Sequence, residues 1–123
     1  MRLIVSIVSA VCVSAAAQNS VPSVFPDDAA APSAGELKAK LSGRTFDVKL
    51  ADGGSWRLEY KANGYFFVNT STGFSDTGEW RTEDGRLCYT ARKLKPGCNE
   101  MRLKAEGIYL KRDSGEIVQY VAR

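Results

Sequence analysis

Turn signals spaced along residues 52–115 are the feature that most constrains the fold of this chain. Each joins a glycine to a polar residue or a proline, and neighbouring signals lie roughly 8–12 residues apart. The signals are Asp52-Gly53, Asn63-Gly64, Thr72-Gly73, Asp84-Gly85, Pro96-Gly97, Glu106-Gly107 and Ser114-Gly115. The runs between them alternate apolar and polar residues, as strands with one buried face do. This spacing is typical of an all-β sandwich or barrel.

The alternating runs predict strands near residues 44–50, 55–61, 65–70, 75–83, 86–91, 99–104, 107–112 and 116–122. Sequential strands joined by short turns form an antiparallel meander, which leaves two exposed edges unless it closes on itself. We therefore expect a small eight-stranded antiparallel up-and-down barrel. A two-layer β-sandwich is the alternative.

One short helix is expected before the barrel. Ser33-Ala34-Gly35-Glu36 matches the capping box S-x-x-E, which satisfies two of the free N–H groups at a helix start. The helix should run from Ala34 to about Ser42 and stop at Gly43. Leu37 and Leu41 would then share one face, which suits a helix that covers an open end of the barrel.

Hairpin geometry predicts which side chains point inward. Asp84-Gly85 favours a two-residue type I′ turn, which places Trp80 opposite Tyr89 on the inner face and Cys88 on the charged outer face. A three-residue loop at 52–54 would pair Leu50 with Trp56. A similar loop at 113–115 would pair Leu110 with Val118, so that both apolar sets stay on one face.

The Asn63-Gly64 turn leads to a candidate binding surface. As a two-residue turn it places Phe67 opposite Tyr60, inside the barrel, and leaves Phe66 and Val68 outside with nearby Tyr65. Such an apolar patch is typical of a partner or ligand surface. Two alternatives remain. A bulge near Gly64 would turn Phe66 inward and Phe67 outward, or the helix would cover the patch.

The first residues predict export. Arg2 is followed by the apolar run Leu3–Val13 and by Ala15-Ala16-Ala17, as in a cleavable signal peptide over residues 1–17. The apolar run is too short to span a membrane. Residues 18–32 are rich in proline and alanine and predict a flexible linker, and residues 33–123 predict a single domain. The expected location is the periplasm or the exterior.

Cleavage would remove Cys12 and leave Cys88 and Cys98, ten residues apart. In an oxidising compartment such a pair predicts a disulfide. A zinc site is the rival, but the chain has no histidine to complete one.

The remaining composition excludes several function classes. The formal net charge is only +3 and the basic residues are scattered, which argues against nucleic-acid binding. Without histidine or a phosphate loop, no catalytic constellation is recognisable, so we expect neither an enzyme nor a cofactor.

Several short motifs resemble a pattern in small exported proteobacterial proteins. They are Leu41–Phe46, Asn63-Gly64-Tyr65, Thr77–Arg81 and Gly85–Tyr89. The pattern, G-x-W followed by dG-x-L-C on consecutive strands, resembles uncharacterised lipocalin-like domains over most of residues 36–120. The resemblance implies a periplasmic or secreted barrel and no activity. The layout is also similar to that of small periplasmic inhibitors of proteases.

Three binding functions remain open. The first, which the sequence favours, is binding of an unknown protein or envelope component on the outer surface, through Tyr65, Phe66 and Val68. The second is a small apolar ligand inside a barrel lined by Trp56, Tyr60, Trp80 and Tyr89. For a chain this short, a core packed solid by those residues is the expectation. The third is inhibition of a hydrolase.

Overall fold

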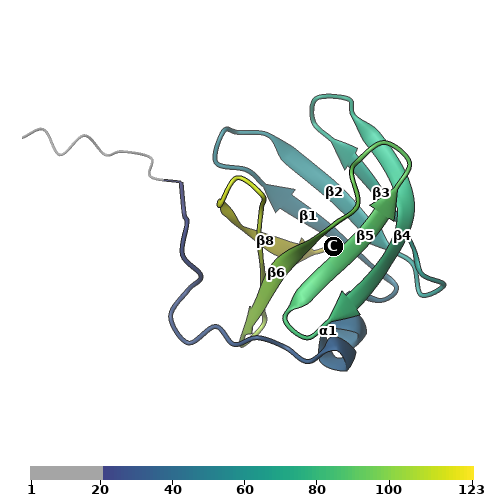
Figure 1. The fold of residues 1–123 in the computed structure, drawn as a ribbon. Coiled ribbons are helices and arrows are strands. Elements are labelled where there is room, and N and C mark those ends of the chain that lie inside the picture. The colour runs from purple at the N-terminus through teal and green to yellow at the C-terminus, as the bar shows by residue number, and fades with distance from the viewer. Residues whose placement is uncertain (1–20) are drawn as a thin grey trace, which may run out of the picture.

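The computed structural model describes residues 21–123, so the expected signal peptide and Cys12 lie outside the described residues. The described chain forms a closed antiparallel barrel in which each strand pairs with the next and β8 pairs back with β1 (Figure 1). The elements are α1 (Ala34–Leu41), β1 (Arg44–Lys49), β2 (Ser55–Tyr60), β3 (Tyr65–Thr70), β4 (Ser75–Glu83), β5 (Arg86–Ala91), β6 (Gly97–Lys104), β7 (Gly107–Lys111) and β8 (Ile117–Ala122). The predicted up-and-down barrel is confirmed, and the sandwich alternative is wrong.

Helix α1 closes one end of the barrel. The Ser33 hydroxyl accepts a hydrogen bond from the Glu36 N–H at 3.1 Å, which caps the helix as the sequence predicts. Leu37 and Leu41 are fully buried in the core. The Thr82 hydroxyl on β4 donates to the Ala34 carbonyl at 2.7 Å and ties the helix to the barrel wall. No helix in residues 21–123 has the length and apolar character that a membrane crossing requires.

Two predicted hairpin registers are confirmed. Trp80 lies opposite Tyr89 across the Asp84-Gly85 turn. Leu110 lies opposite Val118 in the last hairpin. The type I′ assignment for the first of these turns is wrong, because that turn needs positive φ at both central residues and only Gly85 has one, at +72°.

The first hairpin keeps its predicted face but not its predicted pairing. Trp56 lies opposite Val48 instead of Leu50, because the loop spans residues 51–53 and the register moves by two residues. A shift of two preserves the alternation, so Trp56 still points inward.

The expected outward positions of Phe66 and Val68 are wrong. Tyr60 lies opposite Phe66. Phe66 and Val68 are 4% and 6% exposed, whereas Phe67 is 40% exposed. The loop has three residues instead of two, because Gly64 takes a positive φ of +94° while Asn63 does not. The register therefore shifts by one residue, and every side chain of β3 changes face, as in the bulge alternative.

Residues 21–32, predicted as part of a free linker, form a strap on the barrel (Figure 1). Ala30 and Leu103 exchange backbone hydrogen bonds of 2.8 Å, and the Pro32 carbonyl accepts from the Gly85 N–H at 2.8 Å. Arg102 also lies over the Phe25 ring, 5.1 Å from its centroid. The strap pairs with the part of β6 beyond Glu100, where β6 no longer pairs with β5. It therefore supplies hydrogen-bond partners for backbone groups of β6 that β5 does not reach.

Candidate functional site

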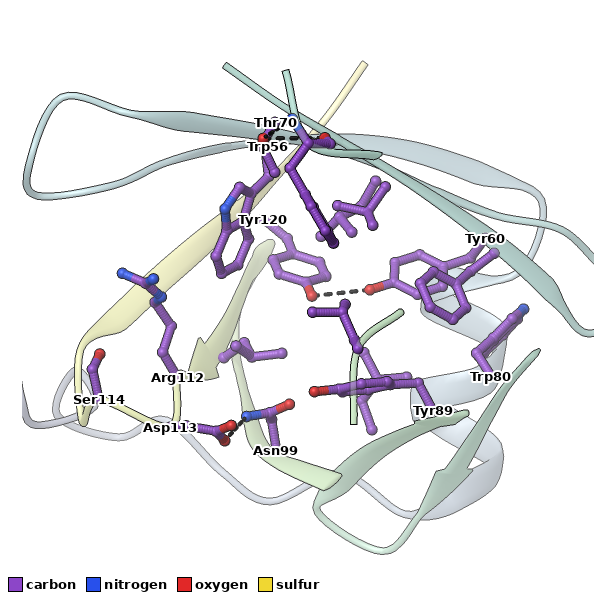
Figure 2. Close-up of a pocket in the computed structure, with 17 residues that line it drawn as sticks. Trp56, Tyr60, Thr70, Trp80, Tyr89, Asn99, Arg112, Asp113, Ser114 and Tyr120 are labelled. Carbon is purple, nitrogen blue, oxygen red and sulfur yellow. Dashed lines mark hydrogen bonds between the residues drawn. The ribbon is translucent and has the colours of Figure 1, made fainter. Parts of the chain in front are cut away.

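The barrel encloses a cavity of about 330 Å³ that opens at the end opposite α1 (Figure 2). Its walls are mostly aromatic and aliphatic. The lining residues are Trp56, Leu58, Tyr60, Phe66, Val68, Thr70, Phe74, Trp80, Leu87, Tyr89, Leu94, Asn99, Leu110, Arg112, Asp113, Ser114 and Tyr120. The interior is therefore partly hollow, although the sequence favoured a solid core.

The hollow follows from which residues face inward near the open end. The inner positions there include Thr70 on β3 and Asn99 on β6, two short polar side chains that line the cavity. At the other end Leu37 and Leu41 enter the core and fill the space. The barrel is thus packed at the α1 end and open at the opposite end.

All four residues that the sequence placed inside the barrel line this cavity. They are Trp56, Tyr60, Trp80 and Tyr89. Trp80 packs edge-on against Tyr60, with ring centroids 5.3 Å apart, and its indole N–H donates to the Lys61 carbonyl at 3.0 Å. That bond satisfies the one polar group of Trp80, which leaves its ring as an apolar wall.

A pair of tyrosines marks the deep part of the cavity. The hydroxyl oxygens of Tyr60 and Tyr120 lie 2.9 Å apart and share a hydrogen bond. Burial raises the pKa of both phenols well above the usual range. Both are protonated at neutral pH, as an ordinary phenol is, and can donate hydrogen bonds.

The rim carries the charged groups of the site. The Arg112 guanidinium lies over the Trp56 ring, 4.9 Å from its centroid. Arg112 also forms an ion pair with the buried Glu116, whose other carboxylate oxygen accepts from the Ala51 N–H at 2.8 Å. Arg112 is thus fixed at the mouth with its charge balanced.

Asp76 is a second buried carboxylate near the mouth of the cavity. Asp76 is 7% exposed and accepts hydrogen bonds from the backbone N–H groups of Thr77, Lys93 and Leu94. Burial alone would raise the pKa of this carboxyl, but the backbone donors and the nearby Lys93 charge lower it below the usual value. Asp76 thereby holds the loop that carries Leu94 to the mouth.

The expected outer patch does not form. Tyr65 is 49% exposed on the outer face, but Phe66 and Val68 lie in the cavity wall. The lining residues that sequence reasoning missed include Phe74, Leu94, Asn99, Arg112 and Tyr120. Tyr120 had a usable signal, because the confirmed register of the last hairpin places it opposite Ile108 on the inner face. The others lie in loops or at strand ends, where the alternation of apolar and polar residues does not predict which side chains face inward.

The predicted disulfide between Cys88 and Cys98 is confirmed, with an S–S distance of 2.06 Å. It joins residues that lie directly opposite each other on β5 and β6. A carboxylate oxygen of Glu83 lies within 4.8 Å of both sulfurs, but neither sulfur is a free thiolate. In this oxidised form the cluster offers a metal ion only one strong ligand.

Comparison with protein-family models, curated proteins and solved structures finds no match to this chain.

Proposed function

We propose that this protein is an exported, non-catalytic carrier that binds one small, largely apolar molecule inside its barrel. The observation that supports this proposal is the cavity of about 330 Å³ with its aromatic and aliphatic wall. Ligand pockets commonly measure about 300–1,000 Å³ and combine apolar walls with a few polar groups. The cavity is at the small end of that range, which favours a compact ligand.

Three further points support the proposal. Phe66 and Val68 point inward, so the outer-surface hypothesis loses two of the three residues on which it rested. The Cys88–Cys98 disulfide is compatible with an oxidising compartment, as export requires. The motif resemblance to lipocalin-like domains points to the same class of barrel.

A neutral fluorescent probe tests the proposal. N-phenyl-1-naphthylamine fluoresces strongly in apolar surroundings, and titration should show saturable binding. The variant Val68→Phe adds volume to the cavity wall and should weaken binding at least about tenfold, which corresponds to ~1.4 kcal/mol. The matched control Phe67→Ala changes the neighbouring outward side chain and should bind as the wild type does.

Both variants are first compared with the wild type by chemical denaturation, so that loss of binding is separated from loss of folding. Absence of saturable binding to the wild type would contradict the proposed function. Equal weakening by Val68→Phe and Phe67→Ala would place the probe outside the barrel and would contradict it as well.

A further inference from the structure

The tyrosine pair inside the cavity has one hydroxyl proton that the hydrogen bond between the two tyrosines does not use. Tyr60 and Tyr120 are 3% and 4% exposed, and their hydroxyls share a single hydrogen bond. Two hydroxyls carry two protons, and this bond uses one of them. Within residues 21–123 neither hydroxyl has another hydrogen-bond partner. One buried O–H donor is therefore left for whatever occupies the cavity.

The placement of this donor is suited to an inserted ligand. Tyr60 on β2 and Tyr120 on β8 both line the cavity, and their hydroxyls meet in its interior (Figure 2). Tyr89 also lines the cavity from β5, and its hydroxyl points toward the side of Asn99 and Asp113 (Figure 2). Apolar side chains surround this small polar centre.

The charge distribution indicates what kind of acceptor fits there. The two phenols are neutral donors at neutral pH, as an ordinary phenol is, and burial raises the pKa of each further. Among the described residues that line the cavity, Arg112 is the single cation, and it lies at the rim in an ion pair with Glu116. A carboxylate placed at the tyrosines would be desolvated without a countercharge, which is strongly unfavourable. A neutral oxygen has no such penalty.

We propose that the ligand is a neutral, largely apolar molecule with one hydrogen-bond acceptor, of the carbonyl or ether class, which it inserts first toward the Tyr60–Tyr120 pair. This inference rests on the proposed function and adds the ligand's chemistry and orientation to it. The hydroxyl proton that the Tyr60–Tyr120 bond does not use is donated to the ligand's oxygen. The apolar body of the ligand then fills the space toward Trp56 and the rim.

Three probes of similar shape separate these features. Benzophenone carries a carbonyl oxygen, 1,1-diphenylethylene replaces that oxygen with a methylene group, and diphenylacetate carries a carboxylate. Each is measured by competition against N-phenyl-1-naphthylamine on the full chain. Benzophenone should bind roughly 3- to 10-fold more tightly than 1,1-diphenylethylene, the range expected for one neutral hydrogen bond. Diphenylacetate should bind at least about tenfold more weakly than benzophenone.

Three variants assign the donor. Tyr60→Phe and Tyr120→Phe each leave one hydroxyl whose proton is free for the ligand, so each should keep the preference for benzophenone. The double variant Tyr60→Phe/Tyr120→Phe has no hydroxyl in the pair and should bind benzophenone and 1,1-diphenylethylene equally. Its retained affinity for 1,1-diphenylethylene reports that the cavity is intact.

The outcomes separate this inference from the proposed function. Binding of N-phenyl-1-naphthylamine with no preference between the two neutral probes leaves the proposed function standing and overturns the inference. A preference that persists in the double variant overturns it too. If diphenylacetate binds as tightly as benzophenone, the inference that the ligand is neutral is overturned, and Arg112 becomes the expected partner of the carboxylate. If none of the probes binds, both proposals fail.

Discussion

At the scale of single residues, Asp76 holds a loop at the rim of the cavity and also contributes to the stability of the fold. Its carboxylate accepts from three backbone N–H groups, and its folded-state pKa is lowered. Because the folded pKa lies below the unfolded value, near 3.8, the ionised carboxylate stabilises the fold above that pH. This contribution is lost as the pH falls from about 3.8 through the folded pKa.

We predict that Asp76→Asn lowers the denaturation midpoint at pH 7 and loses part of the acid dependence of the wild type. An amide brings two donors toward N–H groups that need acceptors, so it cannot replace the carboxylate. Urea denaturation of both proteins at several pH values between 7 and 3 measures the effect. The gap between the two midpoints should narrow as the pH falls below about 3.8.

Asp47→Asn is the matched control, because Asp47 pairs with Arg123 on the outer face, where ion pairs contribute little. Glu59, bonded to Lys61, and Glu83, bonded to Arg81, also have lowered pKa values. Glu59 and Glu83 are present in the wild type and in both variants. The difference in denaturation midpoint between wild type and Asp76→Asn therefore reports on Asp76 alone. A gap between wild type and Asp76→Asn that stays constant at every pH would contradict the assignment.

At the scale of the elements, the contact between β4 and β5 depends on a glycine. A Cβ at Gly78 would lie 2.1 Å from the Thr90 carbonyl oxygen and 2.6 Å from the Ala91 Cα. These are backbone atoms, so no side chain can move aside. Gly78 is the glycine of the G-x-W motif, and two residues later Trp80 enters the core. The motif therefore combines a close strand approach with a core anchor.

We predict that Gly78→Ala destabilises the barrel or prevents it from folding, because β4 and β5 must separate to admit the methyl group. Gly35→Ala is the matched control, since nothing lies within 4 Å of a Cβ at that helical position. Alanine there should stabilise the protein by roughly 0.5–1 kcal/mol. Denaturation midpoints measure both effects, and a Gly78→Ala midpoint equal to that of wild type would refute the prediction.

At the scale of the whole molecule, the disulfide joins neighbouring strands of the barrel wall across the loop that borders the cavity mouth. Closing a loop of this length should stabilise the fold by about 2.5–3 kcal/mol in the chain-entropy description. A domain of this size has modest stability, so the bond contributes a large share of it.

We predict that Cys88→Ser/Cys98→Ser lowers the free energy of unfolding by about that amount, 2.5–3 kcal/mol. The same loss should follow when reductant is added to the wild type, while the double variant should not respond to reductant. Thiol titration of the denatured mature protein, from which cleavage removes Cys12, should detect no thiol before reduction and two after it. Two thiols before reduction would exclude the disulfide.

The sequence by itself determined the barrel and most of its inner face. Regular turn spacing, clean alternation and the capping box are local signals, and each acts over a few residues. Trp56 and Tyr60 could be placed inside because alternation survives a register shift of two, and Trp80 and Tyr89 because the register of their hairpin was predicted correctly. The residues of β3 could not be placed correctly, because one added residue in the loop at Gly64 turns every side chain of the strand to the opposite face.

Only the tertiary structure decided that the barrel is partly hollow and what chemistry its interior offers. The Tyr60–Tyr120 pair joins residues 60 positions apart, and the strap reaches β6 only once the sheet has closed. The rim gathers Arg112, Asn99 and Leu94 from separate loops and strand ends. Contacts of this kind depend on where strands meet in space, which no local pattern specifies. The volume left between side chains is a property of the whole closed sheet.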